Sequence, residues 1–364
     1  MSNYTIKQIF QDNWNDFVLK NNDVVIRPIV FEEVNKIINC GNPDFGYALY
    51  ICDHCHKTLK VPFRCKSRFC NTCGVKYAQD RALSMAKKSI RCQHRHIVFT
   101  MSDKLWFYFQ KYRFLLNGLF EAASQAILSW FYELNKSQNF TPGIMCTLHT
   151  FGRDLKWNPH IHILIAELKL GTNGSCVPWM FFDYDALSKR FQNILLKLLS
   201  KALGKSFSKK KSFLYSNFPN GFYVYAEPKE FKDIKSGVEY VTRYCGRVPI
   251  SENRIVNYDG STVTFSYIAH QDNKYHEVSL DASQFIMILL RHLLPSQFKI
   301  IRYYGFYRKK HSLHTKMIPL IKQHCRNFRK SLLYHQANIL LNFNRDPYNC
   351  PKCDTKMDFV LYIN

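Results

Sequence analysis

Two pairs of cysteines constrain this chain more than any other feature of its sequence. Cys52 and Cys55 form one C-x-x-C knuckle, and Cys70 and Cys73 form a second, separated from the first by fourteen residues. Each knuckle turns the backbone so that two thiolates face one ion, and two knuckles supply the four sulfurs of a tetrahedral zinc site. Four sulfurs leave no open position for a substrate. We therefore predict one structural Zn²⁺ held by Cys52, Cys55, Cys70 and Cys73.

Other metal-binding side chains lie close to these knuckles in the sequence. Cys40 precedes them, and Cys65 lies between them and could replace one of the four predicted ligands. His54 and His56 lie within or beside the first knuckle and could compete for the same ion. The existence of a zinc site is therefore better defined by the sequence than its ligand set.

A third C-x-x-C knuckle spans residues 350–353. Only Cys325 and nearby histidines are at hand to complete it, so it stays an open candidate for a metal site. The chain holds 13 cysteines, and residues 1–20 carry scattered charges instead of a continuous apolar run. We therefore expect a cytoplasmic protein without a signal peptide, whose thiols are reduced and available to metals.

A pair of histidines forms the most informative short motif. His160 and His162 alternate with isoleucines in a β-rich run, and residues two apart on a strand point to the same face. The two imidazoles would therefore form half of a metal site. If this run pairs as a hairpin with the β-rich run before it, His149 falls nearly opposite His160. A one-residue slip would reverse its direction, which leaves Glu227 and Glu239 as rival third ligands.

Tyr240 and Tyr244 are candidate nucleophiles. They lie four residues apart in a segment with helical spacing, so both hydroxyls would lie on one face of a helix. A phenol has a pKa of about 10 and is a poor nucleophile at neutral pH. A metal ion that polarises a phosphate, together with nearby cations, would make it competent.

The charge of the chain indicates an anionic partner. Lys and Arg number 51 against 27 Asp and Glu, which gives a net charge of +24. Nucleic acid is the first candidate and a membrane surface the second, although no apolar run is long enough to span a bilayer. Between Asp281 and Asp346 there are twelve Lys or Arg and no acid. Cations interleaved with rings suit single strands, so we predict DNA contacts from Arg302, Arg308, Lys309 and Lys310.

The succession of helical and β-rich patterns predicts an α+β protein in three regions. Residues 1–90 would form a helical and zinc-binding domain. Residues 91–293 alternate β-rich runs with helical stretches such as residues 184–203, which predicts an antiparallel sheet with helices packed on one side. Residues 294–364 would form a basic, largely helical region that contacts DNA.

The motifs, taken in this order, resemble those of the two-tyrosine HUH transposases of the insertion sequence 91 family. In that family a Cys-rich zinc domain is followed by a strand ending in Phe-Thr, a Pro-His-hydrophobic-His motif and a tyrosine helix. The corresponding positions here are Cys52–Cys73, Val98–Thr100, Pro159–His162 and Tyr240 with Tyr244, with further matches at residues 65–70, 149–152 and 302–306. The resemblance covers residues from about 40 to 306, most of the chain.

This resemblance implies a catalytic HUH domain that nicks and rejoins single-stranded DNA in rolling-circle transposition. His160 and His162, with His149 as the candidate third ligand, would hold Mg²⁺ or Mn²⁺ against the scissile phosphate. One tyrosine would attack and leave a 5′-phosphotyrosine link and a free 3′-hydroxyl, and the second would accept the next strand. The implied partner is single-stranded DNA at the element ends and the target, with no small-molecule substrate.

Two other functions compete with this interpretation. A plasmid-type replication initiator or a relaxase shares the catalytic sheet, but the N-terminal zinc domain and the basic C-terminal region favour the transposase. A zinc protein that binds nucleic acid without catalysis would tolerate the loss of both tyrosines and form no covalent adduct. A transposase would act at the nucleoid, and the sequence leaves its oligomeric state open.

Overall fold

The structure is a computed structural model that describes residues 4–23, 25–67, 69–90, 92–136, 139–226, 248–269, 272–317 and 346–363. The predicted α+β class is confirmed: the described residues form helices and antiparallel sheets. They fall into two compact units, one of residues 1–80, 246–293 and 323–364, the other of residues 81–245 and 294–322. The units cross the predicted boundaries, because residues 246–293 join the N-terminal unit and the C-terminal region is divided between both.

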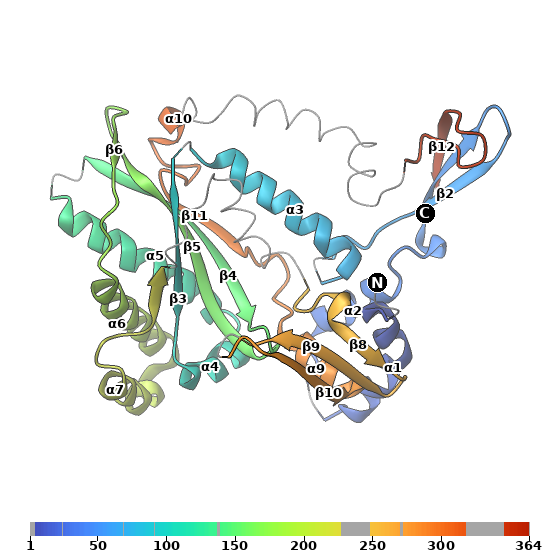
Figure 1. The fold of residues 1–364 in the computed structure, drawn as a ribbon. Helices are drawn as coiled ribbons and strands as arrows, with labels where there is room; N and C mark the ends of the chain where they lie inside the picture. The colour runs from blue at the N-terminus through green and yellow to red at the C-terminus, as the bar shows by residue number, and fades with distance from the viewer. Residues whose placement is uncertain are drawn as a thin grey trace. The chain divides into compact units, whose positions relative to one another are not determined.

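The second unit is built on a twisted antiparallel sheet with the strand order β11-β4-β5-β3-β7, and β6 pairs with β5 (Figure 1). Its strands are β3 (His94–Thr100), β4 (Phe140–Phe151), β5 (Trp157–Gly171), β6 (Cys176–Pro178), β7 (Val224–Ala226) and β11 (Ile301–Gly305). The long hairpin of β4 and β5 forms its centre, where the sequence predicts two paired β-rich runs.

Helices α5 (Leu115–Leu134) and α6 (Tyr184–Leu203) cover the apolar face of this sheet. The isoleucines that alternate with the histidines of β5 point to this face. Ile161 pairs with Phe99 of β3, and the Phe99 ring packs edge-on against Phe191 of α6 with the centroids 5.1 Å apart. All three side chains are fully buried, so this face holds the core of the unit.

The opposite face carries the polar side chains of the same strands. The end of α3 (Asn71–Lys88) and the residues after it contact this face. The Ser89 hydroxyl lies 3.9 Å from Sδ of Met145 on β4, and the backbone N–H of Ile90 donates to the Tyr307 hydroxyl. The short helices α4 (Trp106–Lys111), α7 (Ser208–Asn217) and α10 (His314–Met317) complete the unit.

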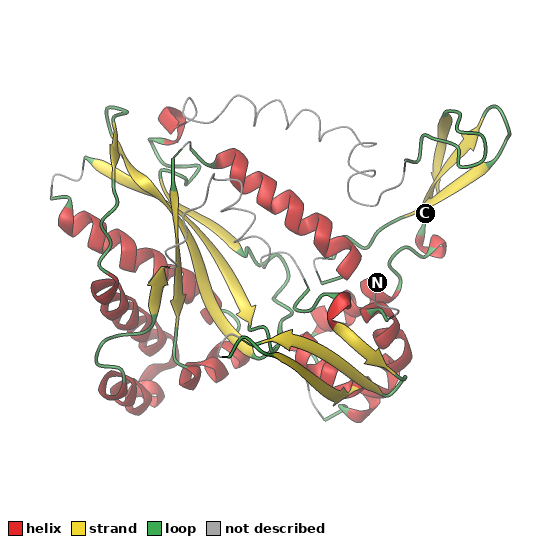
Figure 2. Cartoon of the chain, viewed as in Figure 1, coloured by secondary structure: helices red, strands yellow, loops and turns green. Residues whose placement is uncertain are grey.

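The first unit contains a helical subdomain with its own sheet (Figure 2). The sheet has the order β10-β9-β8, and helix α9 follows β10 directly. Arg27 donates hydrogen bonds to the carbonyl oxygens of Leu290 and Leu293 at the end of α9, where carbonyls lack helical partners. The elements are α1 (Ile6–Lys20), α2 (Pro28–Ile38), β8 (Ile255–Tyr258), β9 (Thr262–Ile268), β10 (Tyr275–Asp281) and α9 (Ala282–Arg291).

The same unit also contains a small three-stranded sheet. Strands β1 (Tyr47–Cys52) and β2 (Thr58–Pro62) form a hairpin, and β12 (Met357–Ile363) pairs antiparallel with β1. The last described strand therefore lies beside the first strand of the chain. Among the residues that the structure describes, no helix is both long and apolar enough to cross a membrane.

Candidate functional site

Three histidines converge on the polar face of the large sheet. His149 on β4 pairs directly with His160 on β5, so the predicted register is the observed one. His162 follows on the same face, and its ring centroid lies 3.9 Å from that of His149 and 4.8 Å from that of His160. One ring nitrogen from each histidine lies within 4.8 Å of the others. Three imidazoles at this spacing are a suitable donor set for a divalent ion.

The surroundings keep two of these imidazoles neutral, which metal binding requires. Burial lowers the pKa of His160 to about 4. Burial, together with the neighbouring His149, His160 and His96 rings, lowers the pKa of His162 well below its usual value. Nδ1 of His160 lies 2.7 Å from the carbonyl oxygen of Asn158, which can only accept. Nδ1 therefore carries the proton, and Nε2 is left with its lone pair for a metal.

A fourth histidine, His96, contacts the cluster from the neighbouring strand β3. Its Nε2 lies 2.7 Å from Nδ1 of His162, and the two rings are nearly parallel. Sequence reasoning missed this residue. His96 lies two residues before Val98, and Val98 pairs with His162. Residues two apart on a strand share a face, so strand alternation was the signal that could have identified His96.

A buried hydroxyl adds an oxygen to the same face. Thr147 on β4 pairs with His162, is fully buried, and its Oγ1 has no hydrogen-bond partner within the described part of the chain. A buried polar atom without a partner indicates a bound water or ion nearby. The donor set and this hydroxyl together fit a hydrated divalent cation.

Both predicted nucleophiles, Tyr240 and Tyr244, lie outside the described residues, as do the rival ligands Glu227 and Glu239. Another tyrosine pair does lie on the histidine face. Tyr225 of β7 pairs with Val98, and the carbonyl of Tyr223 accepts a hydrogen bond from the backbone N–H of Thr100. Their rings stack with the centroids 5.9 Å apart, and both are exposed.

The predicted zinc ligands do not form one group, which corrects the prediction from sequence. Cys70 and Cys73, at the start of α3, lie with Cys40 and Cys65. Cys52 and Cys55 lie instead with Cys350 and Cys353. Equal C-x-x-C spacing could not show which knuckles meet, because that depends on contacts between residues distant in the sequence.

The first cysteine cluster, Cys40, Cys65, Cys70 and Cys73, has the dimensions of a tetrahedral zinc site. Sγ of Cys40 lies 3.7 Å from Sγ of both Cys70 and Cys73, and Cys65 lies 3.6 Å from Cys73. Four sulfurs about 2.3 Å from one Zn²⁺ are about 3.8 Å apart, whereas a disulfide would need about 2 Å. The Ser67 hydroxyl donates to Glu33 of α2 and holds the loop between Cys65 and Cys70.

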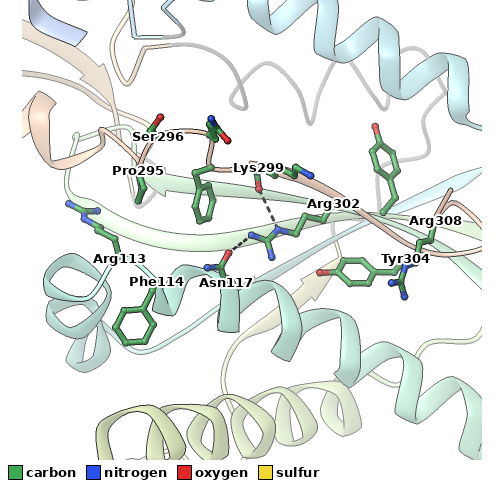
Figure 3. A pocket seen from close by; sticks show the side chains of 12 residues that line it. Arg113, Phe114, Asn117, Pro295, Ser296, Lys299, Arg302, Tyr304 and Arg308 are labelled. Atoms are coloured by element: carbon green, nitrogen blue, oxygen red, sulfur yellow. Dashed lines mark hydrogen bonds between the residues drawn. The ribbon is translucent and has the colours of Figure 1, made fainter. Parts of the chain in front are cut away.

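Two of the predicted DNA contacts line an open groove of about 870 Å³ beside β11 and the start of α5 (Figure 3). The Arg302 guanidinium donates to the side chain of Asn117 and lies 4.3 Å from the ring centroid of Phe120. Arg302 pairs with Cys146, which is next to Thr147 and therefore points to the opposite face of the sheet. The groove thus lies on the apolar face, which α5 and α6 cover. Arg113 and Arg308 also line it, and among the residues that the structure describes no acidic side chain does.

The remaining predicted contacts follow a tight turn. Gly305 ends β11 with a φ of 60°, and a Cβ at this position would lie 1.7 Å from the carbonyl oxygen of Pro142. Only glycine permits this approach to β4. The turn leads to Arg308, Lys309 and Lys310, which are all exposed. Three consecutive cations on the surface can neutralise phosphates.

Comparison with known proteins places these features in a family. A family model described as "Transposase zinc-binding domain" and belonging to insertion sequence 91 matches residues 9–101. A second, described as "Putative transposase", matches residues 143–314. The first range holds the first cysteine cluster, and the second holds the histidines of β4 and β5 with the basic turn. No solved structure matches the chain significantly.

Two curated relatives agree with these matches. The chain is 26% identical to "Transposase for insertion sequence element IS801" from Pseudomonas savastanoi pv. phaseolicola, over 93% of this chain and 85% of the relative. It is also 26% identical to "Putative transposase y4qJ" from Sinorhizobium fredii, over 73% of this chain and 71% of that relative. The predicted resemblance is confirmed, since zinc-binding and transposase domains follow in the expected order. This chain belongs to the insertion sequence 91 family of DNA transposases.

Proposed function

We propose that this transposase nicks and rejoins single-stranded DNA by transesterification to tyrosine, at a site centred on His149, His160 and His162. The observation that carries the proposal is the convergence of three imidazoles on one sheet face, with one nitrogen of each within 4.8 Å of the others. A family that moves DNA needs a group that activates phosphate, and the described residues offer this donor set for it.

In this proposal His149, His160 and His162 hold Mg²⁺ or Mn²⁺, which when bound polarises the scissile phosphate and offsets its developing negative charge. The carbonyl of Asn158 and the ring of His96 hold two of the ligands in orientation. Imidazole ligands alone bind such hard ions loosely, so we expect the ion to exchange with solvent.

The chemical step belongs to Tyr240 or Tyr244. The phenol loses its proton, its oxygen forms a bond to phosphorus, and the bond from phosphorus to the 3′ oxygen breaks. The 3′ oxygen takes up a proton and leaves as a free hydroxyl, while the 5′ end stays linked to tyrosine. The energy of the phosphodiester is conserved in that link, so rejoining to a new 3′-hydroxyl needs no nucleotide cofactor.

The first cysteine cluster would hold a structural zinc in the zinc-binding domain. Its four thiolates fill a tetrahedral shell, which excludes a substrate from the ion. Lys66, in the loop from Cys65 to Cys70, is exposed on a surface that the zinc would keep rigid. We propose that this domain contributes to DNA binding and takes no part in the chemical step.

The experiment that tests the proposal detects a covalent adduct. Full-length protein is incubated with labelled single-stranded DNA of the element ends and Mn²⁺, and the denatured products are separated on a gel. We expect a protein–DNA band that is lost when Tyr240 and Tyr244 are both changed to Phe. Phe keeps the ring and removes only the nucleophilic oxygen.

The matched control changes Tyr223 and Tyr225 to Phe, because these two exposed tyrosines lie on the histidine face of the sheet. This variant should still form the adduct. An adduct that survives in the first variant and disappears in the second would assign the nucleophile to β7 instead. A protein that binds the DNA but never forms an adduct would be a non-enzymatic binding protein.

A further inference from the structure

The second cysteine cluster joins the two ends of the described chain. Sγ of Cys52 lies 3.6 Å from Sγ of Cys353, and Sγ of Cys55 lies 3.5 Å from Cys350 and 3.6 Å from Cys353. These separations match those of the first cluster and the about 3.8 Å expected between sulfurs around one tetrahedral zinc. They are far too long for disulfides, which need about 2 Å.

The two knuckles of this cluster have the same backbone geometry. The residue after each pair, His56 or Asp354, has a positive φ of 53° or 58°. Its N–H donates to the carbonyl oxygen of the first cysteine, at 2.8 Å for Cys52 and 2.9 Å for Cys350. A non-glycine residue in this left-handed conformation is uncommon, and two at matching positions indicate a turn shaped for metal binding.

The cluster also has a protected and ordered environment. Cys52 and Cys350 are buried and form a small core with Tyr50 and Met357. Register fixes their approach, because Cys52 at the end of β1 pairs with Met357 at the start of β12. The Thr355 hydroxyl makes a polar contact with the cluster, 3.2 Å from Sγ of Cys52. Such hydrogen bonds to sulfur are typical of the surroundings of a metal thiolate.

We propose that Cys52, Cys55, Cys350 and Cys353 hold a second structural Zn²⁺, which fastens the C-terminal knuckle to the N-terminal hairpin. The zinc-binding family match ends at residue 101 and the transposase match at residue 314, so neither includes residues 350–353.

Metal content of the full-length protein tests the site. We expect two zinc ions per chain when the zinc content of the dialysed protein is measured by elemental mass spectrometry. Cys350→Ser with Cys353→Ser should leave one zinc ion, and Cys40→Ser with Cys65→Ser should also leave one. Cys176→Ser, an exposed cysteine outside both clusters, should leave two. One zinc ion in the unchanged protein, or two in the Cys350 and Cys353 variant, would overturn the proposal.

Two further measurements keep the test valid if a cysteine variant fails to fold: Co²⁺ substitution, and cleavage of the chain before the C-terminal knuckle. Co²⁺ replacing zinc should give the tetrahedral thiolate absorption of two sites per chain, reduced to half in either double variant. A protease recognition sequence inserted after Gln336 allows the C-terminal knuckle to be cut free in otherwise unchanged protein. The cut fragment should stay bound during gel filtration and leave after zinc is chelated. If the cut fragment separates at once, or stays bound in protein that is fully free of zinc, zinc does not fasten the C-terminal knuckle.

Discussion

Nε2 of His96 lies 2.7 Å from Nδ1 of His162, and their ring planes are 8° from parallel. If Nε2 of His162 binds the metal, its Nδ1 carries a proton and donates it to His96. His96 then acts as a positioning residue that orients a ligand without touching the ion or the DNA. Outer partners of this kind commonly account for about 10–100-fold in metal affinity.

The prediction from this contact is a shift in metal dependence. His96→Ala should raise the Mn²⁺ concentration needed for half-maximal cleavage by about 10–100-fold, and saturating Mn²⁺ should restore much of the rate. His96→Gln should recover part of the affinity, because its side-chain amide can reach the position of Nε2. A merely structural role would lower the rate equally at every Mn²⁺ concentration, and that result would contradict the prediction.

A second prediction concerns the ligands themselves. His160→Ala or His162→Ala should abolish cleavage and leave binding of single-stranded DNA nearly unchanged, since binding rests on other residues. Cleavage gels and fluorescence anisotropy, with the same oligonucleotide and protein, separate the two effects. His276→Ala changes a half-buried histidine on β10 of the first unit and should cleave normally. Residual cleavage by both ligand variants would place the metal elsewhere.

The hairpin of β4 and β5 shows how far sequence could lead. Alternation of Ile161 and Ile163 with His160 and His162 predicted which face each side chain takes, because strand period is a local property. The pairing of His149 with His160 followed from the turn between the runs. Tyr240 and Tyr244, the other half of the predicted site, lie outside the described residues, so their placement stays a prediction.

Long-range pairing is what the sequence could not supply. Cys55 and Cys350 are 295 residues apart and meet because β12 pairs with β1, a contact without any local signal. The sequence predicts residues 255–291 as part of the region 91–293, whereas their packing assigns them to the first unit. Side-chain alternation and knuckle spacing are therefore predictable one segment at a time, whereas partners between distant segments are not.

His94 predicts how stability depends on pH. Burial lowers the pKa of this histidine to about 4, from about 6.5 in an unfolded chain. Nδ1 lies 3.0 Å from the carbonyl oxygen of Cys92 and donates to it, so Nε2 accepts from the Tyr307 hydroxyl at 2.7 Å. The depressed pKa means that the stabilisation is fully present above pH 6.5 and is lost as the pH falls toward 4.

The measurement compares unfolding free energies of the unchanged protein and His94→Gln between pH 7.5 and 4.5. The advantage of the unchanged protein should shrink by up to about 3 kcal/mol as the pH falls through this window. Acid release of zinc affects both proteins alike and cancels in the difference. Tyr307→Phe keeps the ring that buries His94 and should keep the pH dependence. An advantage that stays constant with pH would mean that His94 is protonated in the folded protein.

The basic turn after β11 predicts a salt-dependent contribution to DNA binding. Lys309→Ala and Lys310→Ala should each weaken binding similarly for all sequences. Each should also flatten the slope of log affinity against log salt by about 0.7 for every phosphate that is no longer neutralised. Lys274→Ala, an equally exposed lysine before β10, should leave the slope unchanged. Binding titrations at four salt concentrations give the slopes, and an unchanged slope in both variants would exclude this turn from the DNA interface.

Tyr223 and Tyr225 predict a stacking contact beside the histidine cluster. Their rings lie 18° from parallel and remain 62% and 43% exposed, on the sheet face that carries His162. Unpaired bases stack on such rings, and each contact contributes about 1–3 kcal/mol. Changing both residues to Ala should therefore weaken binding to a single-stranded oligonucleotide by at least tenfold and leave duplex binding nearly unchanged, because bases in a duplex already stack on one another.

The Phe variants separate stacking from hydrogen bonding at the same positions. Tyr223→Phe with Tyr225→Phe keeps both aromatic faces, so binding of single-stranded DNA should stay within about twofold of the unchanged protein. The salt slope should be the same in the Ala and Phe variants, since neither removes a charge. If Phe weakens binding as much as Ala, the hydroxyls make the contact and the rings do not stack on bases. If neither change alters binding, the DNA does not pass over β7.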